Sequence, residues 1–98
     1  MNASNRPRVG VFLGGMSSER EASLASGRQV CMHLDRAKYA VVPIFVDLQA
    51  RFWELPQKLL IQNTTVDIIA RLEREARRIP YESLKGEIEL AFIALHGK

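Results

Sequence analysis

Three side chains in this sequence could hold a small molecule by its charges: the carboxylates of Glu19 and Glu21 and the imidazole of His96. A carboxylate in the first turn of a helix is stabilised by the helix dipole by about 0.3 to 1 kcal/mol, and it suits an ammonium group. An imidazole can donate a hydrogen bond to an anion. The alternatives are a solvated glutamate that only stabilises its helix and a histidine satisfied inside the core.

The two glutamates differ in what the sequence explains. Ser18 is followed three residues later by Glu21, which is the spacing of a capping box. In that motif the serine hydroxyl and the glutamate carboxylate each bind a backbone N–H of the first helical turn. Glu21 is therefore expected to have a structural role. Glu19 is not needed for the cap, and we expect it to face a ligand.

Gly14 and Gly15 interrupt an apolar segment shortly before these glutamates. A strand that ends in such a turn and continues as a helix presents backbone N–H groups at the carboxyl end of the strand, where open α/β sheets bind ligands. The spacing of Gly10, Gly14 and Gly15 does not fit the dinucleotide fingerprint G-x-G-x-x-G, and Met16 stands where a P-loop has its lysine. Neither nucleotide-binding motif is therefore expected at this turn.

A hydrolase site is also disfavoured. The segment Gly15 to Glu19 matches the nucleophile elbow G-x-S-x-G except at its final glycine. A catalytic triad of Ser17, His96 and Asp47 can be written from the sequence, but the missing elbow argues against it.

Apolar runs near residues 8–13, 40–47 and 88–95 predict three strands, because near-continuous apolar segments are typical of parallel strands covered on both faces. Helical periodicity predicts helices near residues 19–34 and 65–78. Strands that alternate with helices indicate the α/β class, here a Rossmann-like doubly wound parallel sheet.

The expected strand order places the first strand between the second and the third. The switch point then lies between the first and third strands, which is where such sheets bind ligands. The segment Gly14 to Glu19 and His96 would face one crevice there. Gly97 would allow the backbone to approach a ligand closely.

Each predicted helix has one apolar face. In the first helix the face that we expect on the sheet consists of Leu24, Gly27, Val30, Cys31 and Leu34. In the second helix the corresponding stripe is Val66, Ile69, Leu72, Ala76 and Ile79, ending before Pro80. Gly27 would let helix and strand approach closely. Thr64 and Asp67 give the start signal of the second helix.

Residues 49–62 have the weakest pattern, and their aromatic residues suggest a hairpin-like excursion folded against the domain. Pro43 cannot donate to a strand ladder, so it is expected near an edge or an irregularity of the sheet. Phe45, Trp53 and Phe92 are expected in the core rather than around a cofactor.

The charge pattern favours a solvated surface. The chain has 98 residues, enough for one small domain, and a formal net charge of +3. Much of the excess is an arginine cluster in which Glu73 with Arg77 and Arg71 with Glu75 have i,i+4 spacing on a helix. We therefore expect self-paired charges here and no nucleic-acid partner.

Cys31 is the single cysteine, which excludes an intrachain disulfide and fits a reducing compartment. The sequence has no apolar segment that approaches the ~18 residues of a membrane span, and no signal-peptide pattern at its start. We expect a cytoplasmic location and no membrane partner.

Two segments resemble a known family, the D-alanine:D-alanine ligases. Val9 to Gly27 contains GGMSSEREAS and resembles the opening segment of these enzymes, and Ala91 to Lys98, AFIALHGK, resembles the end of their third strand. The remaining stretch, residues 48–87, matches only loosely. Two separate matches at a suitable distance identify the chain as similar to this family.

The resemblance implies an ATP-grasp ligase that forms D-alanyl-D-alanine from two D-alanines for peptidoglycan, with ATP and Mg²⁺. Residues 1–98 would then be only its N-terminal, pre-ATP-grasp domain, and the central and C-terminal domains would be absent. Glu19 would orient the ammonium of the first D-alanine, and His96 would lie beside its carboxylate. Ser17, Ser18 and the Gly14 and Gly15 backbone would shape the substrate pocket.

The resemblance also implies what this part of the enzyme lacks. In the family the groups that bind ATP and magnesium belong to later domains, so this chain alone is expected to bind neither and to be inactive. The full-length enzyme is expected to be a homodimer. Two alternatives remain: a stand-alone Rossmann-like binding module without catalysis, and an ATP-grasp ligase with a different acceptor.

Overall fold

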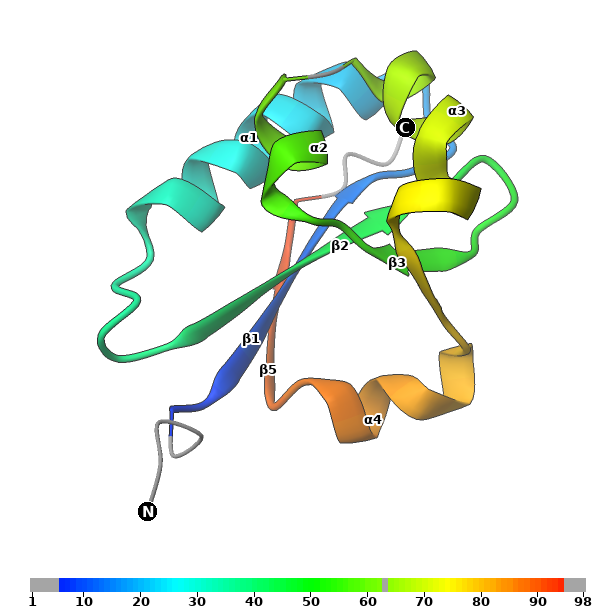
Figure 1. Cartoon of the computed structure of the whole chain (residues 1–98). Coiled ribbons are helices and arrows are strands. Elements are labelled where there is room, and N and C mark those ends of the chain that lie inside the picture. Colours follow the sequence, from blue (N-terminus) through cyan, green and yellow to red (C-terminus); the bar gives the residue numbers. More distant parts are fainter. Residues whose placement is uncertain (1–5, 63, 95–98) are drawn as a thin grey trace.

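A five-stranded sheet with helices on both faces forms the protein (Figure 1). The structure is a computed structural model, and it describes residues 6–62 and 64–94. The strands are β1 (Arg8–Gly14), β2 (Ala40–Val46), β3 (Phe52–Glu54), β4 (Arg77–Ile79) and β5 (Leu90–Ile93). The helices are α1 (Arg20–His33), α2 (Gln57–Gln62), α3 (Thr65–Glu75), the 3₁₀ turn η2 (Tyr81–Ser83) and α4 (Leu84–Glu87).

The strand order is β4-β3-β2-β1-β5. β1 is parallel to β2 and to β5, which confirms the predicted arrangement of the first strand between the other two. β3 and β4 extend the sheet by antiparallel pairing beyond β2. The predicted α/β class is confirmed, and the sheet is parallel at its centre as predicted; the antiparallel edge formed by β3 and β4 was not predicted.

The larger core lies between the sheet and helices α1, α2 and α3 (Figure 1). Leu24 and Cys31 of α1 are buried there, as predicted, and Val30 and Leu34 pack against the same cluster. Gly27 touches β1 so closely that an added Cβ would lie 2.5 Å from Cδ2 of Leu13. The predicted close approach of helix and strand is therefore confirmed.

The opposite face of the sheet has a smaller core. Phe12, Ile44 and Ile79 of the strands are buried there, and Leu84 and Ile88 pack against them from the α4 region. Figure 1 shows α4 on this side of the sheet, away from α1, α2 and α3. Helices on both faces agree with the predicted doubly wound arrangement.

The excursion predicted for residues 49–62 is a hairpin followed by a short helix. β3 pairs antiparallel with β2, and Trp53, opposite Phe45, is buried. Pro43 is in the middle of β2, opposite Val11 of β1, and one residue beyond the last pair between β2 and β3; its carbonyl accepts a hydrogen bond from Leu55 N–H at 3.0 Å. β2 is an interior strand, so Pro43 is not at an edge of the sheet; it lies instead where the short β2–β3 ladder ends, and no ladder N–H is needed there.

The second long helix is shorter than predicted. The Thr64 side chain accepts a hydrogen bond from Asp67 N–H, which confirms the start signal, but α3 ends at Glu75 rather than near residue 78. Residues 77–79 form β4 instead and pair with β3. Val66 is 65% exposed, so the predicted apolar stripe is wrong at this position.

The third predicted strand is also shorter and less covered than expected. β5 spans Leu90–Ile93 instead of 88–95, and all four of its residues are exposed. Phe92 is 47% exposed, so its predicted place in the core is wrong, whereas Phe45 and Trp53 are buried. The reason is position, because β5 is the edge strand of the described part of the sheet and pairs there only with β1.

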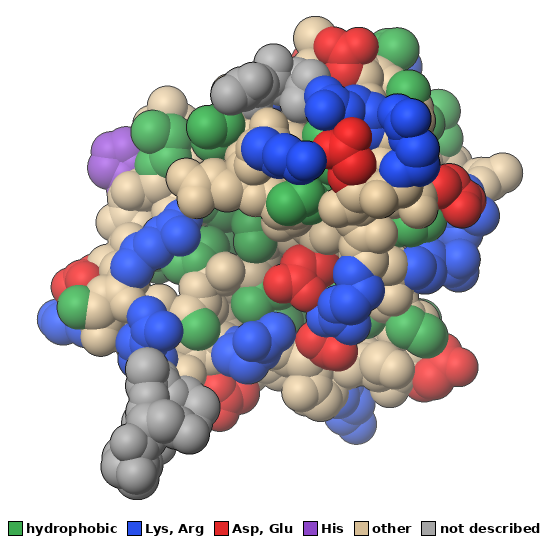
Figure 2. All heavy atoms as spheres, in the orientation of Figure 1, with side chains coloured by type: hydrophobic (Ala, Val, Ile, Leu, Met, Phe, Trp, Pro, Cys, Tyr) green, Lys and Arg blue, Asp and Glu red, His purple; other side chains and the backbone are tan. Residues whose placement is uncertain are grey.

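The arginine cluster is self-paired, as expected, but with different partners. Arg71 binds Glu75 at 3.0 Å. The predicted pair of Glu73 with Arg77 is wrong, because the helix has ended and Arg77 in β4 binds Glu54 and Glu87. Figure 2 shows basic and acidic side chains interspersed over the visible face. Within residues 6–62 and 64–94, no helix has both the length and the apolar character to cross a bilayer.

Candidate functional site

The glycine turn after β1 uses the conformational freedom that only glycine has. Gly14 and Gly15 have φ values of +88° and +101°, in the left-handed region that strains other residues. A Cβ on Gly14 would also lie 2.7 Å from the Phe45 ring. Two successive glycines are therefore required for β1 to turn sharply towards α1.

The N–H groups of both glycines are used inside the protein. Gly14 N–H donates to the Ser23 hydroxyl at 2.9 Å, and Gly15 N–H donates to the Val46 carbonyl at 2.8 Å. The expectation that these two N–H groups face a ligand is therefore wrong. They fix the turn against α1 and β2, and a bound molecule would meet the side chains and later amides of the turn.

Ser23 is a residue that the sequence reading missed. Its side chain is fully buried in α1 and accepts the Gly14 N–H. Ser23, Gly27 and Cys31 are spaced by four residues and lie on the buried face of α1. A serine in line with the apolar face of a helix was the signal that could have indicated this contact, since a buried hydroxyl needs a partner.

The predicted capping box is absent. The N-cap of α1 is Glu19, which makes no side-chain capping bond, and its own N–H donates to the Ser17 hydroxyl at 2.8 Å. Ser17, rather than Ser18, therefore fixes the start of the helix. Glu19 is exposed at this helix start, where the positive end of the dipole stabilises its charge.

Glu21 binds another helix instead of its own. Its carboxylate accepts the N–H of Thr65 at 3.1 Å and also the Thr65 hydroxyl. Thr65 is the fully buried first residue of α3. Glu21 therefore has a structural role, as predicted, but not the predicted cap of its own helix. Its side chain joins the starts of α1 and α3, which lie side by side (Figure 1).

Arg20 contributes a further polar group at the turn. Its Nη1 donates to the Ser17 carbonyl at 3.4 Å. Its Nε is buried and has no hydrogen-bond partner among the residues that the structure describes. A buried donor without a partner is uncommon, and it lies beside the candidate site.

The parallel strands end on the same edge of the sheet. Gly14 at the end of β1 pairs with Val46 at the end of β2, and Ala94 after β5 donates its N–H to the Phe12 carbonyl. Ala94, the residue directly after β5, therefore lies next to the end of β1, where the glycine turn begins. His96, Gly97 and Lys98 lie outside the described residues, so the predicted approach of His96 to Glu19 remains a prediction.

Asp47, the third member of the hypothetical triad, has other partners. Its buried carboxylate accepts hydrogen bonds from the backbone N–H groups of Gln49 and Arg51, from Arg51 Nε and from Trp53 Nε1, all at 2.8 to 2.9 Å. Burial alone would raise the pKa of Asp47, but these hydrogen bonds together lower it. The carboxylate stabilises the hairpin turn, and the structure gives the triad no support.

The described residues contain no group of three or more His, Cys, Asp or Glu side chains that could hold a metal ion. Cys31 is fully buried, and burial raises the pKa of its thiol to about 11. At neutral pH this thiol is protonated, so it behaves as a small apolar side chain. The exposed carboxylate of Glu19 beside the glycine turn can bind a cationic group of an organic molecule.

Comparison with known proteins gives the same family over nearly the whole chain. Residues 8–98 match the family model described as "D-ala D-ala ligase N-terminus". A D-alanine–D-alanine ligase of Desulforudis audaxviator is 41% identical over 92% of this chain, and one of Clostridium botulinum strain Hall is 33% identical over 93%. The chain spans about one fifth of the length of these relatives, 20% and 21% respectively.

Solved structures of similar fold come from the same kind of enzyme. The D-alanine-D-alanine ligase of Coxiella burnetii superimposes with a TM-score of 0.64 at 29% identity, over 76% of this chain and 21% of its own. The VanG D-Ala:D-Ser ligase of Enterococcus faecalis has the same fold, with a TM-score of 0.75 at 21% identity over 95% of this chain and 30% of its own. On the family match, the glycine turn and the parallel sheet that it follows, the chain belongs to the family of D-alanine–D-alanine ligase N-terminal domains.

Proposed function

We propose that this domain binds the first D-alanine of an ATP-dependent ligase that joins two D-alanines for peptidoglycan synthesis in the cytoplasm. The observation that carries the proposal is the exposed carboxylate of Glu19 at the start of α1, directly after the fixed glycine turn. The family match over residues 8–98 and the ligase names of the relatives support the reaction.

Glu19 would bind the ammonium group of D-alanine. A carboxylate and an ammonium form a charge-assisted hydrogen bond, which is about twice as strong as a neutral one. The turn fixes the backbone of Glu19 through its N–H bond to Ser17, and the Gly14 N–H bond to Ser23 fixes the turn to α1. Glu19 would therefore position the amino acid so that its carboxylate reaches the reacting phosphoryl group, rather than transfer a proton.

His96 would lie beside the carboxylate of the same D-alanine and donate a hydrogen bond to it. β5 leads the chain to the edge of the sheet that holds the glycine turn. Ser17, Ser18 and the backbone of Gly14 and Gly15 would shape the wall of the pocket. In this proposal the two glycines contribute shape, since their N–H groups already have partners.

ATP and Mg²⁺ would be held by parts of the enzyme that this chain does not span. ATP supplies the phosphoryl group that activates the D-alanine carboxylate. The glycine turn has Met16 at the position of a P-loop lysine, and no metal-binding group occurs within the described residues. We therefore assign no step of the ATP chemistry to residues of this domain, and expect the 98-residue chain alone to be inactive. The full-length enzyme would act as a homodimer.

The test is Glu19→Gln in the full-length ligase that carries this domain. Loss of one charged hydrogen bond, worth about 1.5 to 3 kcal/mol, is expected to lower kcat/KM for the first D-alanine by about 10- to 100-fold and to raise its KM. Steady-state kinetics with varied D-alanine and saturating ATP measure both constants.

Glu82→Gln provides the matched control, because Glu82 is an exposed glutamate on η2, away from the turn. This control should keep the kinetics of the unsubstituted enzyme. Unchanged kinetics in Glu19→Gln would remove the assigned role of Glu19.

A further inference from the structure

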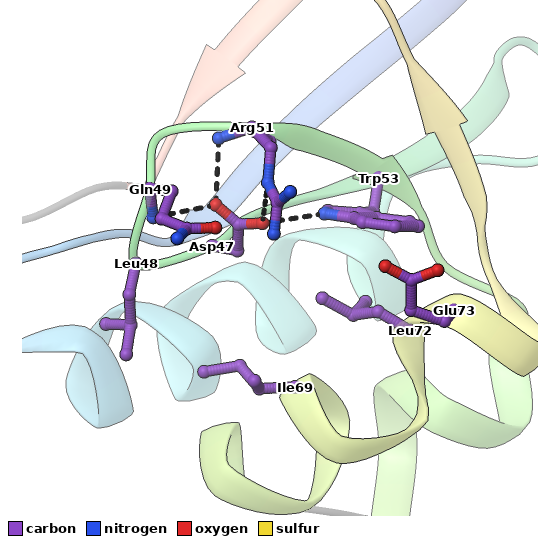
Figure 3. A pocket seen from close by; sticks show the side chains of 8 residues that line it. All are labelled: Asp47, Leu48, Gln49, Arg51, Trp53, Ile69, Leu72 and Glu73. Atoms are coloured by element: carbon purple, nitrogen blue, oxygen red, sulfur yellow. Dashed lines mark hydrogen bonds and ion pairs between the residues drawn. The ribbon is translucent and has the colours of Figure 1, made fainter.

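A cavity lies between the β2–β3 hairpin turn and helix α3 (Figure 3). Its volume is about 310 Å³, at the lower end of the range of small-molecule sites, ~300 to 1,000 Å³. Ile69 and Leu72 of α3 line it on one side, and Trp53 of β3 lines it on another. None of its lining residues belongs to the glycine turn, so it is separate from the candidate D-alanine site.

The hairpin side of the cavity is held rigidly. Asp47 is 3% exposed and binds the turn through Gln49, Arg51 and Trp53. Ala50 in this turn has a φ of +63°, a strained value for a residue other than glycine. The turn is therefore fixed before any ligand binds, which lowers the entropy that binding costs.

Two opposite charges are available at this cavity. Arg51 uses Nε to bind Asp47, and its terminal nitrogens have no hydrogen-bond partner among the described residues. The carboxylate of Glu73, which points towards Trp53 in Figure 3, has no hydrogen bond or ion pair within the same part of the chain. The two groups do not bind each other, although both line the same cavity.

The chemistry of these groups defines a ligand. A guanidinium with two free N–H₂ groups binds a carboxylate through paired hydrogen bonds, and a carboxylate binds an ammonium. Between them, Trp53, Leu72 and Ile69 offer apolar contact for short side chains. A ligand that meets both groups must carry both charges. The terminal charges of a dipeptide lie further apart than the ammonium and carboxylate of a free amino acid, which share one carbon atom, so a dipeptide suits two groups that do not contact each other.

We propose that this cavity binds a zwitterionic dipeptide with small apolar side chains, its carboxylate on Arg51 and its ammonium on Glu73. Such a dipeptide separates its terminal charges by a peptide unit and places its side chains on the apolar wall. This site is additional to the Glu19 site, and its recognition chemistry does not depend on the proposed ligase activity.

The experiment uses the 98-residue chain and D-alanyl-D-alanine as the probe. Trp53 is the only tryptophan of the chain, so its fluorescence and its indole N–H resonance report on this cavity alone. Titration should give a saturable change in both signals below about 10 mM dipeptide. N-acetyl-D-alanyl-D-alanine, which lacks the ammonium, should bind at least about tenfold more weakly. Absence of any change with D-alanyl-D-alanine, or equal binding of the acetylated probe, would overturn the inference.

Three variants locate the signal. Glu73→Gln changes an exposed side chain without a structural partner and should weaken binding by at least about tenfold, whereas Glu82→Gln should not. Glu19→Gln should leave the titration unchanged, because Glu19 belongs to the other site. If Glu19→Gln abolished the signal, or if Glu73→Gln did not affect it, the dipeptide would not be bound here. Failure of this inference leaves the kinetic test of Glu19 untouched.

Discussion

At the scale of single residues, buried polar side chains hold the two turns beside the candidate sites. Ser23 accepts the N–H of Gly14, and Asp47 accepts three hydrogen bonds from the hairpin turn and one from Trp53 of β3. The side chains of Ser23 and Asp47 thus accept backbone N–H groups that are not paired between strands. One buried polar side chain therefore contributes to the rigidity of each turn, together with the backbone hydrogen bonds of the turn.

Asp47→Asn tests this dependence. The substitution removes the charge and one acceptor oxygen, leaving donors of Arg51 or Trp53 without a full partner, so the free energy of unfolding should fall by about 1 to 3 kcal/mol at pH 7. Because the folded protein lowers the pKa of Asp47, its contribution is complete above the unfolded value of about 4 and is lost as the pH falls through the lower folded value.

Urea unfolding of the unsubstituted chain and of Asp47→Asn between pH 2 and 7 measures this effect. The contribution of Asp47 is expected to be lost at about pH 4 and below. The difference between the two proteins should shrink in acid, where Asp47 is protonated. Exposed Glu82, substituted by Gln, serves as the control and should leave the curve unchanged. A constant difference at all pH values would show that the charge of Asp47 does not stabilise the turn.

The residues of the candidate site were predictable to different degrees. Glu19 could be placed at the start of a helix because the glycine pair and the apolar face of α1 are both visible in the sequence. The role of Glu21 could not be predicted correctly, because its partner Thr65 is 44 residues away. Spacing rules describe contacts within one element, and they do not include a second helix that lies beside it.

At the scale of elements, the contact between α1 and β1 sets the position of Glu19. Gly27 has no side chain at the point where the helix touches Leu13, and an added Cβ would lie 2.7 Å from the Leu13 Cβ. Gly27→Ala should therefore lower the free energy of unfolding by about 1 to 3 kcal/mol, despite the better helix propensity of alanine.

Gly86→Ala is the matched control, since an added Cβ at this position of α4 meets nothing within 4 Å. It should leave stability unchanged or raise it by about 0.5 to 1 kcal/mol. Thermal unfolding of the two variants compares them directly. Equal stability of Gly27→Ala and the unsubstituted chain would mean that α1 can shift on the sheet without cost.

The ends of helices and strands are predicted less well from sequence patterns than their presence. The helical stripe of residues 65–78 continues past the real end of α3, because Arg77 and Arg78 are compatible with a helix in isolation. They become a strand because β3 offers a free edge and Glu54 and Glu87 bind Arg77 across it. The pairing is between segments 23 residues apart, so no local propensity contains it.

At the scale of the whole molecule, the sheet has unequal edges. β4 at one edge is short and carries Arg77 and Arg78, which protect against pairing with other chains. β5 at the other edge exposes Leu90 and Phe92 on the face that α1 covers further along the sheet, and Ile93 on the opposite face. The parallel register was predictable from the apolar runs, but the exposure of β5 depends on which neighbours are present.

Among residues 6–62 and 64–94 no strand pairs with the outer edge of β5, and this edge predicts self-association of the 98-residue chain. An edge strand with apolar side chains on both faces and a free row of backbone groups is a template for pairing with another copy. Phe92 is 47% exposed, so its replacement by lysine removes apolar surface from the edge and adds a charge that opposes pairing.

The control is Val66→Lys, which changes an apolar residue of α3 that is 65% exposed and lies away from this edge. Sedimentation velocity over a range of concentrations should show association of the unsubstituted chain and of Val66→Lys, and a monomer for Phe92→Lys. A chain that stays monomeric at all concentrations, or an equal effect of both lysines, would show that β5 is not the surface through which copies meet.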